Sequence, residues 1–265
     1  MLIIKQLFKY YIYMISIFLI GRVALFIIYF DKLSESDSSI WLSFIYGLRM
    51  DTIVTGILLA IPLIVLTLFP KVLKSFSEIF LKYYFLVVLA SLIYIENATF
   101  PFIAQYDVRP NYLFVEYLEY PKEVFSMIFA DYKLELSIAL VMIGGFIYLY
   151  LKNVKDSVGE IFEISYLKRV ALFIPILLVL FMGVRSSFGH RGANVSDAMY
   201  SSNRMLNEIT KNSIHAIGYA IYINKKHGSG KLVKQYGKMD LQEAYSRVKS
   251  SLNIESIDKT SPLKD

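Results

Sequence analysis

The sequence predicts an all-α membrane protein: five transmembrane helices, interfacial amphipathic helices on the outer face, and a helical extracytoplasmic tail. The chain is 56% hydrophobic over 265 residues, with a mean hydropathy of +0.50, which is too apolar for an ordinary soluble domain. Five stretches are long and apolar enough to cross a bilayer, which takes roughly 17 to 25 residues of helix. Lysines and arginines gather in alternate loops, which is the pattern that orients multi-pass proteins.

The five spans are expected near 8–30, 52–70, 83–104, 134–151 and 169–184. The first is longer than the apolar region of a signal peptide and no cleavage site follows it, so we expect it to remain as an anchor. Positive charges such as Lys5, Lys71 and Lys152 fall on one side of these spans. The N-terminus is therefore predicted to be cytoplasmic, and the tail after the fifth span extracytoplasmic.

Between the third and fourth spans, the segment RPNYLFVEYLEYPKEV (109–124) combines charges, tyrosines and two prolines. Pro110 and Pro121 each fit the first turn of a helix, so the segment predicts two short helices that lie in the membrane interface. Glu116 and Glu119 are three residues apart and share a helical face. They form either a solvated edge or, together with Arg109, a surface that holds a lipid headgroup or docks an extracytoplasmic domain.

A third interfacial helix is expected after the first span, where SDSSIWLSFIYGLRMD offers Ser38 or Ser39 as an N-cap before an apolar face. At the end of this segment, Arg49 and Asp51 enter the second span at its outer boundary. Snorkelling to the membrane surface is the simplest role for both side chains.

Two charges lie deeper in the predicted spans. Arg22 is ~12 Å of helix below the outer end of the first span, and Glu96 lies at a similar depth in the third. Intramembrane charges usually face a partner inside the bundle, so we expect an Arg22–Glu96 pair with Asn97 beside it. The pair either fixes helix packing or, with Arg49, offers guanidinium groups to a lipid phosphate.

The tail predicts one amphipathic helix near 201–222 and a second near 241–252, the latter capped by Asp240 with Glu243 at its third position. Few large apolar side chains lie in these 80 or so residues, which excludes a catalytic domain with its own core. The chain has no cysteine and no paired catalytic carboxylates, its histidines lack metal-ligand spacing, and no basic stripe predicts nucleic-acid binding. A lipid is therefore the expected partner.

Three segments in order, YGLRMD, DVRPNYLFVEYLEYPKEV and SSNRMLNEITKNSIHAIGYAI, resemble the membrane portion of lipoteichoic acid synthase-like proteins, which are phosphoglycerol transferases of the alkaline phosphatase and sulfatase superfamily. The resemblance covers nearly the whole chain. It implies a five-span membrane domain (1–184) in the bacterial cytoplasmic membrane and a linker (185–265) to an extracytoplasmic sulfatase-like domain. In that domain, a metal-assisted threonine takes the headgroup from phosphatidylglycerol.

The resemblance implies no catalytic residue, metal ligand or cofactor on this chain, since the threonine and the Mn or Mg ion belong to the catalytic domain, present in cis or in trans. The headgroup is either glycerol phosphate or phosphoethanolamine. A second interpretation is a non-enzymatic membrane scaffold or a lipid transporter. A reading frame that continues into a sulfatase-like domain would favour the first interpretation.

Overall fold

The computed structural model describes residues 2–34, 36–117, 120–153, 158–187, 189–227 and 239–251. Every regular element in these ranges is helical, and five helices are long and apolar enough to cross a membrane, as the sequence predicts. The long helices are α1 (Leu2–Ile28), α3 (Leu42–Leu68), α4 (Lys74–Tyr106), α7 (Lys133–Asn153) and α9 (Tyr166–Arg185). The shorter ones are α2 (Phe30–Ser34), η1 (Lys71–Leu73), α5 (Tyr112–Tyr117), α6 (Pro121–Asp131), α8 (Val158–Ile161), η2 (Val195–Ala198), α10 (Arg204–Thr210), α11 (Ser213–His227) and α13 (Leu241–Ser251).

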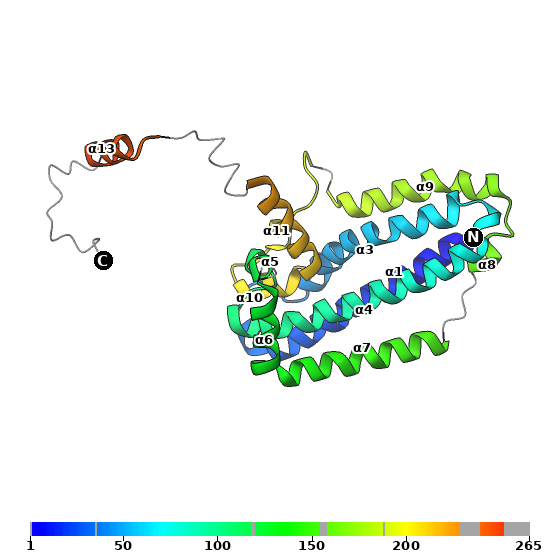
Figure 1. Ribbon diagram of the computed structural model, residues 1–265, viewed down its shortest axis with the longest axis horizontal. Helices are drawn as coiled ribbons and strands as arrows, with labels where there is room; N and C mark the ends of the chain where they lie inside the picture. Colours follow the sequence, from blue (N-terminus) through cyan, green and yellow to red (C-terminus); the bar gives the residue numbers. More distant parts are fainter. Residues whose placement is uncertain are drawn as a thin grey trace. The chain divides into compact units, whose positions relative to one another are not determined.

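The long helices alternate in direction, so their termini gather at two ends of a bundle (Figure 1). The end that holds the N-terminus and α8 is called the α8 end; the opposite end, which holds α5, α6 and α10, is called the α10 end. The α10 end is the one that the charge pattern predicts to be extracytoplasmic. The orientation of the bundle, and the position of α5 and α6 at the membrane interface, stay predictions.

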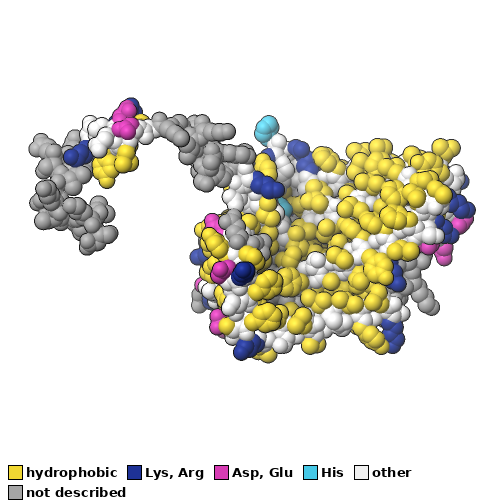
Figure 2. All heavy atoms as spheres, in the orientation of Figure 1, with side chains coloured by type: hydrophobic (Ala, Val, Ile, Leu, Met, Phe, Trp, Pro, Cys, Tyr) yellow, Lys and Arg dark blue, Asp and Glu magenta, His cyan; other side chains and the backbone are white. Residues whose placement is uncertain are grey.

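Helices α1, α3 and α4 form the centre of the bundle. Helix α3 packs against α1 and α9, and α4 packs against α1 and α7, so α7 and α9 lie on opposite flanks. The flanking helices bury little of their surface, whereas α3 is largely buried. Hydrophobic side chains cover the lengths of the long helices, and charged side chains gather near their ends (Figure 2). This distribution suits a bundle whose apolar outer surface meets lipid.

Three central helices begin earlier than the sequence predicts. Helix α3 begins at Leu42 rather than at residue 52, so the expected separate interfacial helix forms its first turns. Trp41 occupies the N-cap position without a side-chain hydrogen bond, and the predicted serine caps were wrong. A charge usually marks a membrane boundary, so the sequence predicts a span that starts after Asp51. In the fold Asp51 is buried, so the helix continues through it.

The tail helix predicted at 201–222 is in fact two helices, α10 and α11. Asn212 separates them: its side-chain oxygen accepts hydrogen bonds from the backbone N–H groups of Ile214 and His215, at 3.0 and 3.1 Å. An asparagine side chain that satisfies the first N–H groups of a helix is an effective N-cap. A new helix therefore starts at Ser213, and the chain turns sharply before it.

The chain divides into two units, Met1–Ile221 and Tyr222–Asp265. Residues 185–221, assigned by the sequence to the linker, thus belong to the first unit, where α10 packs on α1, α2 and α3. In the second unit, α13 begins where predicted. The Asp240 carboxylate accepts a hydrogen bond from the N–H of Gln242 at 3.0 Å, as expected of an N-cap.

Candidate functional site

A cavity of about 270 Å³ lies between α4, α5, α6 and α7 near the α10 end. Its walls are mostly aliphatic and aromatic side chains, with few polar groups. The polar lining residues, together with one small residue of α7, include Asn97, Gln105, Tyr106, Tyr117, Tyr132, Glu135 and Ala139. This space is called the α4–α7 cavity. Small-molecule sites are typically apolar hollows with a few placed polar groups, and this cavity has that composition.

Two hydrogen bonds join the polar groups that line the cavity. The hydroxyl groups of Tyr106 and Tyr117 lie 2.7 Å apart, which links α4 to α5. Tyr132 donates to the Gln105 side-chain oxygen at 2.8 Å, which links the residue between α6 and α7 back to α4. These two contacts, both between exposed side chains, link α5 and the residue between α6 and α7 to α4.

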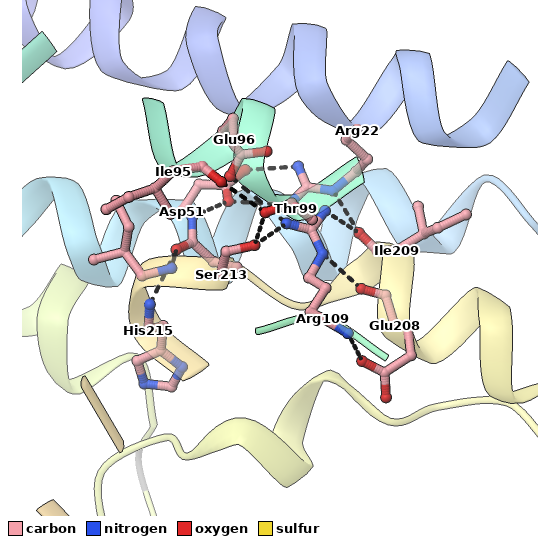
Figure 3. Close-up of polar contacts among 12 residues, drawn as sticks. Arg22, Asp51, Ile95, Glu96, Thr99, Arg109, Glu208, Ile209, Ser213 and His215 are labelled. Carbon is pink, nitrogen blue, oxygen red and sulfur yellow. Dashed lines mark hydrogen bonds and ion pairs between the residues drawn. The ribbon is translucent and has the colours of Figure 1, made fainter. Parts of the chain in front are cut away.

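Arg22 lies on the other side of α4, and its partner is Asp51. The guanidinium donates two hydrogen bonds to the Asp51 carboxylate, at 2.6 and 2.9 Å (Figure 3). Both side chains are buried, with exposed fractions of 2% and 1%. The predicted Arg22–Glu96 pair was therefore wrong. The bidentate contact forms because α3 continues through Asp51 and presents it to α1.

Glu96 faces Arg109 instead, with 3.6 Å between a carboxylate oxygen and the guanidinium. Neither Glu96 oxygen accepts a hydrogen bond from the described residues. Arg109 itself is fully engaged: it donates to the Glu208 carbonyl at 2.8 Å and to the Ser213 hydroxyl at 2.9 Å. Its backbone N–H donates to the Glu208 carboxylate at 2.9 Å. Arg109 is thus a buried residue rather than part of an exposed surface.

Burial lowers the pKa of Arg109, and the Glu96 carboxylate opposes part of this shift. An arginine starts from a pKa above about 12, so its guanidinium stays charged. Burial also lowers the pKa of His215, which favours the neutral imidazole in the first turn of α11. Lys211, a further buried cation, contacts the Glu208 carboxylate at 2.5 Å. Three basic and three acidic side chains therefore lie buried together, and they are called the buried charge cluster: Arg22, Asp51, Glu96, Arg109, Glu208 and Lys211.

The buried charge cluster holds the C-terminus of α10. The last carbonyl groups of a helix lack intrahelical partners. Arg22 donates to the Ile209 carbonyl at 3.2 Å, and Arg109 donates to the same oxygen at 3.3 Å (Figure 3). Asn212 adds a hydrogen bond to Asp51 at 2.8 Å. The arginines in the cluster therefore fix the turn between α10 and α11 on the membrane helices.

Arg49 has an equivalent role at the end of α9. Its guanidinium donates to the Ser186 carbonyl at 2.9 and 2.6 Å. Ser186 is the C-cap of α9 and has a left-handed backbone, with φ of 45°. The three arginines that the sequence offered to a lipid phosphate, Arg22, Arg49 and Arg109, thus contact backbone carbonyls of this chain.

The remaining predicted residues lie apart from the cluster. Asn97 follows Glu96 on α4 but lines the cavity, and its amide donates to the Ile93 carbonyl at 2.8 Å. Glu116 is exposed on α5, and Glu119 lies outside the described residues. The expected joint surface of Arg109 with Glu116 does not form, because Arg109 points to α10 and Glu116 to solvent.

Two glycines allow the cluster to pack closely. A Cβ atom at Gly21 would overlap the Glu96 carboxylate, and one at Gly47 would overlap the Arg22 guanidinium. Small residues let neighbouring membrane helices and their polar groups approach. Both glycines lie within a helical turn of a charge in the sequence, so this pattern was a local indication of close packing that sequence reasoning missed.

Sequence reasoning also missed Asp51 as a partner, Glu208 as a buried acid, and the pairing of Tyr132 with Gln105. Asp51 and Arg22 are both charges next to apolar runs, and their similar depth becomes evident once α3 is extended. Glu208 gave no such indication, because an acid in an amphipathic tail helix is usually solvated.

No protein-family model matches this chain, and no solved structure matches it. Within the described ranges, no group of three or more His, Asp or Glu side chains is placed to hold a metal ion. Function is therefore inferred from the chemistry of the cavity and the buried charge cluster.

Proposed function

We propose that this chain is the membrane module of a headgroup transferase similar to the lipoteichoic acid synthase-like phosphoglycerol transferases. It resides in the bacterial cytoplasmic membrane with the α10 end outside, and it holds a phospholipid, phosphatidylglycerol in the first place, for a sulfatase-like catalytic domain in cis or in trans. The observation that carries the proposal is the α4–α7 cavity, an apolar space between membrane helices at the end where the headgroup chemistry would occur. The ordered sequence segments that resemble this family support it.

The cavity accommodates part of an acyl chain. Burial of apolar lipid surface against its aromatic and aliphatic walls stabilises the bound lipid by roughly 25 cal/mol per Å². The groups that line it, such as Tyr106, Gln105 and Tyr132, meet the ester region of a lipid by hydrogen bonds. A lipid held in this way keeps its phosphate outside the cavity, in reach of an extracytoplasmic domain.

The chemistry itself belongs to the catalytic domain. There the threonine hydroxyl would lose its proton and form a bond to phosphorus, while the bond from phosphorus to the diacylglycerol oxygen would break and that oxygen would take up a proton. An acceptor hydroxyl would then lose its proton and bond the phosphorus, and the bond from phosphorus to the threonine oxygen would break as that oxygen regains a proton. A divalent Mn or Mg ion on that domain would supply charge stabilisation for both displacements. The part of this chain is to bind and orient the lipid.

Filling the cavity is expected to slow headgroup transfer. Ala139 is buried in the cavity wall on α7, and its neighbour Leu140 is 61% exposed on the outer surface of the same helix. We expect Ala139→Phe to reduce transfer of labelled headgroup from phosphatidylglycerol by roughly tenfold, equivalent to about 1.4 kcal/mol of lost lipid binding. The assay uses membranes of the source organism with the variant gene at its own locus, so that a catalytic domain in cis or in trans is present.

Leu140→Phe is the matched control, because it adds the same ring to the same helix outside the cavity. Its transfer rate should equal that of the unmodified protein at equal protein level. Purified chain 1–265 alone, with Mn or Mg, should release no headgroup. If deletion of the whole gene leaves phosphatidylglycerol and phosphatidylethanolamine headgroup transfer unchanged, the transferase proposal is wrong and a scaffold or transporter role replaces it.

A further inference from the structure

The α4–α7 cavity has an unusual charge for a site that would meet phospholipids. Among the described residues that line it, no side chain is a lysine or an arginine. Glu135, in the first turn of α7, is its one charged lining residue in those ranges, and it is acidic. The other polar groups, including Tyr106, Tyr117, Tyr132 and Gln105, are neutral. A phosphate placed within this lining would find no counter-ion and would be repelled by Glu135.

The nearby arginines do not compensate for this lack. Glu96 and Asn97 are consecutive on α4, yet Glu96 faces the buried charge cluster and Asn97 faces the cavity. The guanidinium groups of Arg22 and Arg109 are buried on the Glu96 side, where each is bound to carbonyl or carboxylate oxygens. Moving either one toward the cavity would break a buried ion pair, which costs several kcal/mol.

Neutral hydroxyl and ester groups do match the lining. In the Tyr106–Tyr117 contact, one hydroxyl donates and the other retains its own hydrogen, and each oxygen keeps acceptor capacity. Gln105 uses its side-chain oxygen for Tyr132, and its amide group, which also contacts the Tyr106 side chain, is a hydrogen-bond donor on the lining. These groups offer donors to ester carbonyls and an acceptor to an alcohol. An uncharged lipid therefore finds partners without the desolvation cost of an ion.

We propose that the α4–α7 cavity selects an uncharged lipid that carries ester groups and a free hydroxyl, of the diacylglycerol class, over anionic phospholipids with the same acyl chains. A phospholipid enters by its acyl chain only with the phosphate outside the lining. As a step in catalysis, which rests on the proposed function, the cavity retains the diacylglycerol after its headgroup has left. The selectivity itself requires only the chain described here.

Competition between lipids tests the selectivity directly. The purified full chain, in nanodiscs of phosphatidylcholine, binds a diacylglycerol with one fluorescent acyl chain. Unlabelled dioleoylglycerol should displace this probe at a mole fraction roughly tenfold lower than dioleoyl phosphatidic acid or dioleoyl phosphatidylglycerol. Ala139→Phe should weaken probe binding by a similar factor, and Leu140→Phe should leave it unchanged.

A charge reversal identifies the cause. Glu135→Lys puts a cation on the cavity lining and should narrow the preference for dioleoylglycerol by about threefold or more. Leu134→Lys is the matched control: Leu134 is 70% exposed, does not line the cavity, and lies in the same helical turn, so the added charge meets the same helix terminus. Its lipid preference should stay that of the unmodified chain.

Equal or better competition by phosphatidic acid would overturn the proposal. Probe binding that is insensitive to Ala139→Phe would also overturn it, because the probe would then bind outside the cavity. Equal effects of Glu135→Lys and Leu134→Lys on lipid preference would overturn it as well, because the charge of the lining would then not set the selectivity. None of these results depends on headgroup transfer. A failed transfer assay with intact lipid selectivity would therefore reject the transferase and keep the site.

Discussion

Replacing Arg22 with leucine is expected to destabilise the bundle by about 3 to 5 kcal/mol, because the change leaves the Asp51 carboxylate buried without its cation. Asp51→Leu should cost a similar amount for the reciprocal reason. The two side chains share two hydrogen bonds and are almost completely buried, so solvent cannot replace the lost partner. The midpoint of thermal unfolding, followed by size-exclusion chromatography of detergent-solubilised protein, measures both effects.

The double variant Arg22→Leu/Asp51→Leu should recover a large part of this loss. Removing both charges leaves neither ion buried without its partner, and recovery stays incomplete because Asn212 loses its acceptor on Asp51 and the Ile209 carbonyl loses one donor. Arg22→Leu/Glu96→Leu should recover much less. Equal recovery in the two double variants would contradict the assigned pairing. Lys32→Ala, which breaks an exposed contact with Asp107, is the control and should cost only about 0 to 1 kcal/mol.

Replacing Arg109 with alanine should release the turn between α10 and α11 from the bundle. Arg109 donates to the carbonyls of Glu208 and Ile209 and to Ser213, so its loss removes most of the capping at the end of α10. The chain has no cysteine, so a single Thr210→Cys variant reports on this turn alone. Thr210 is fully buried, and its labelling by a maleimide should rise roughly tenfold or more in the Arg109→Ala background.

Two controls separate this local release from general unfolding. Ser202→Cys, on an exposed residue before α10, should label equally fast with and without the Arg109 change. Arg49→Ala, which removes the cap at the end of α9 instead, should leave Thr210→Cys protected. Continued protection of Thr210→Cys in Arg109→Ala would show that apolar packing of α10 is sufficient to hold the turn.

The five spans can be predicted from the sequence because a helix that crosses a bilayer needs a long run of consecutive apolar residues. The ends of the spans follow less well. The segment SDSSIWLSFIYGLRMD predicts an interfacial helix because a serine N-cap precedes an apolar face, and a sequence window treats the charges of Arg49 and Asp51 as the end of the apolar region. In the bundle, Arg22 forms an ion pair with Asp51, so α3 continues through this charged residue.

The buried charge cluster depends on contacts between residues far apart in the chain. Arg22 and Ile209 are separated by 187 positions, and Arg109 and Glu208 by 99. Helical periodicity places side chains on a face but does not state which distant segment covers that face. The sequence thus identified Arg22, Glu96 and Arg109 as unusual, and could not identify the α10–α11 turn as what they hold.

The cavity was accessible to sequence reasoning only in part. The tyrosines of residues 109–124 and the two short helices predicted from Pro110 and Pro121 indicated a surface that prefers the membrane interface. Sequence periodicity does not show that these residues line a cavity with Gln105 and Tyr106 of α4, or that Tyr132, between α6 and α7, donates a hydrogen bond to Gln105.

The most direct test of a lipid-binding membrane module is photo-crosslinking of phosphatidylglycerol that carries a diazirine near the end of one acyl chain. The full chain is reconstituted with this lipid, irradiated and digested, and the adducts are mapped by mass spectrometry. We expect adducts concentrated on cavity-lining residues between 94 and 106 and between 124 and 139, lost in Ala139→Phe and retained in Leu140→Phe. Adducts spread evenly over the exposed faces of α1, α7 and α9, with no response to Ala139→Phe, would show that the cavity does not take a lipid chain.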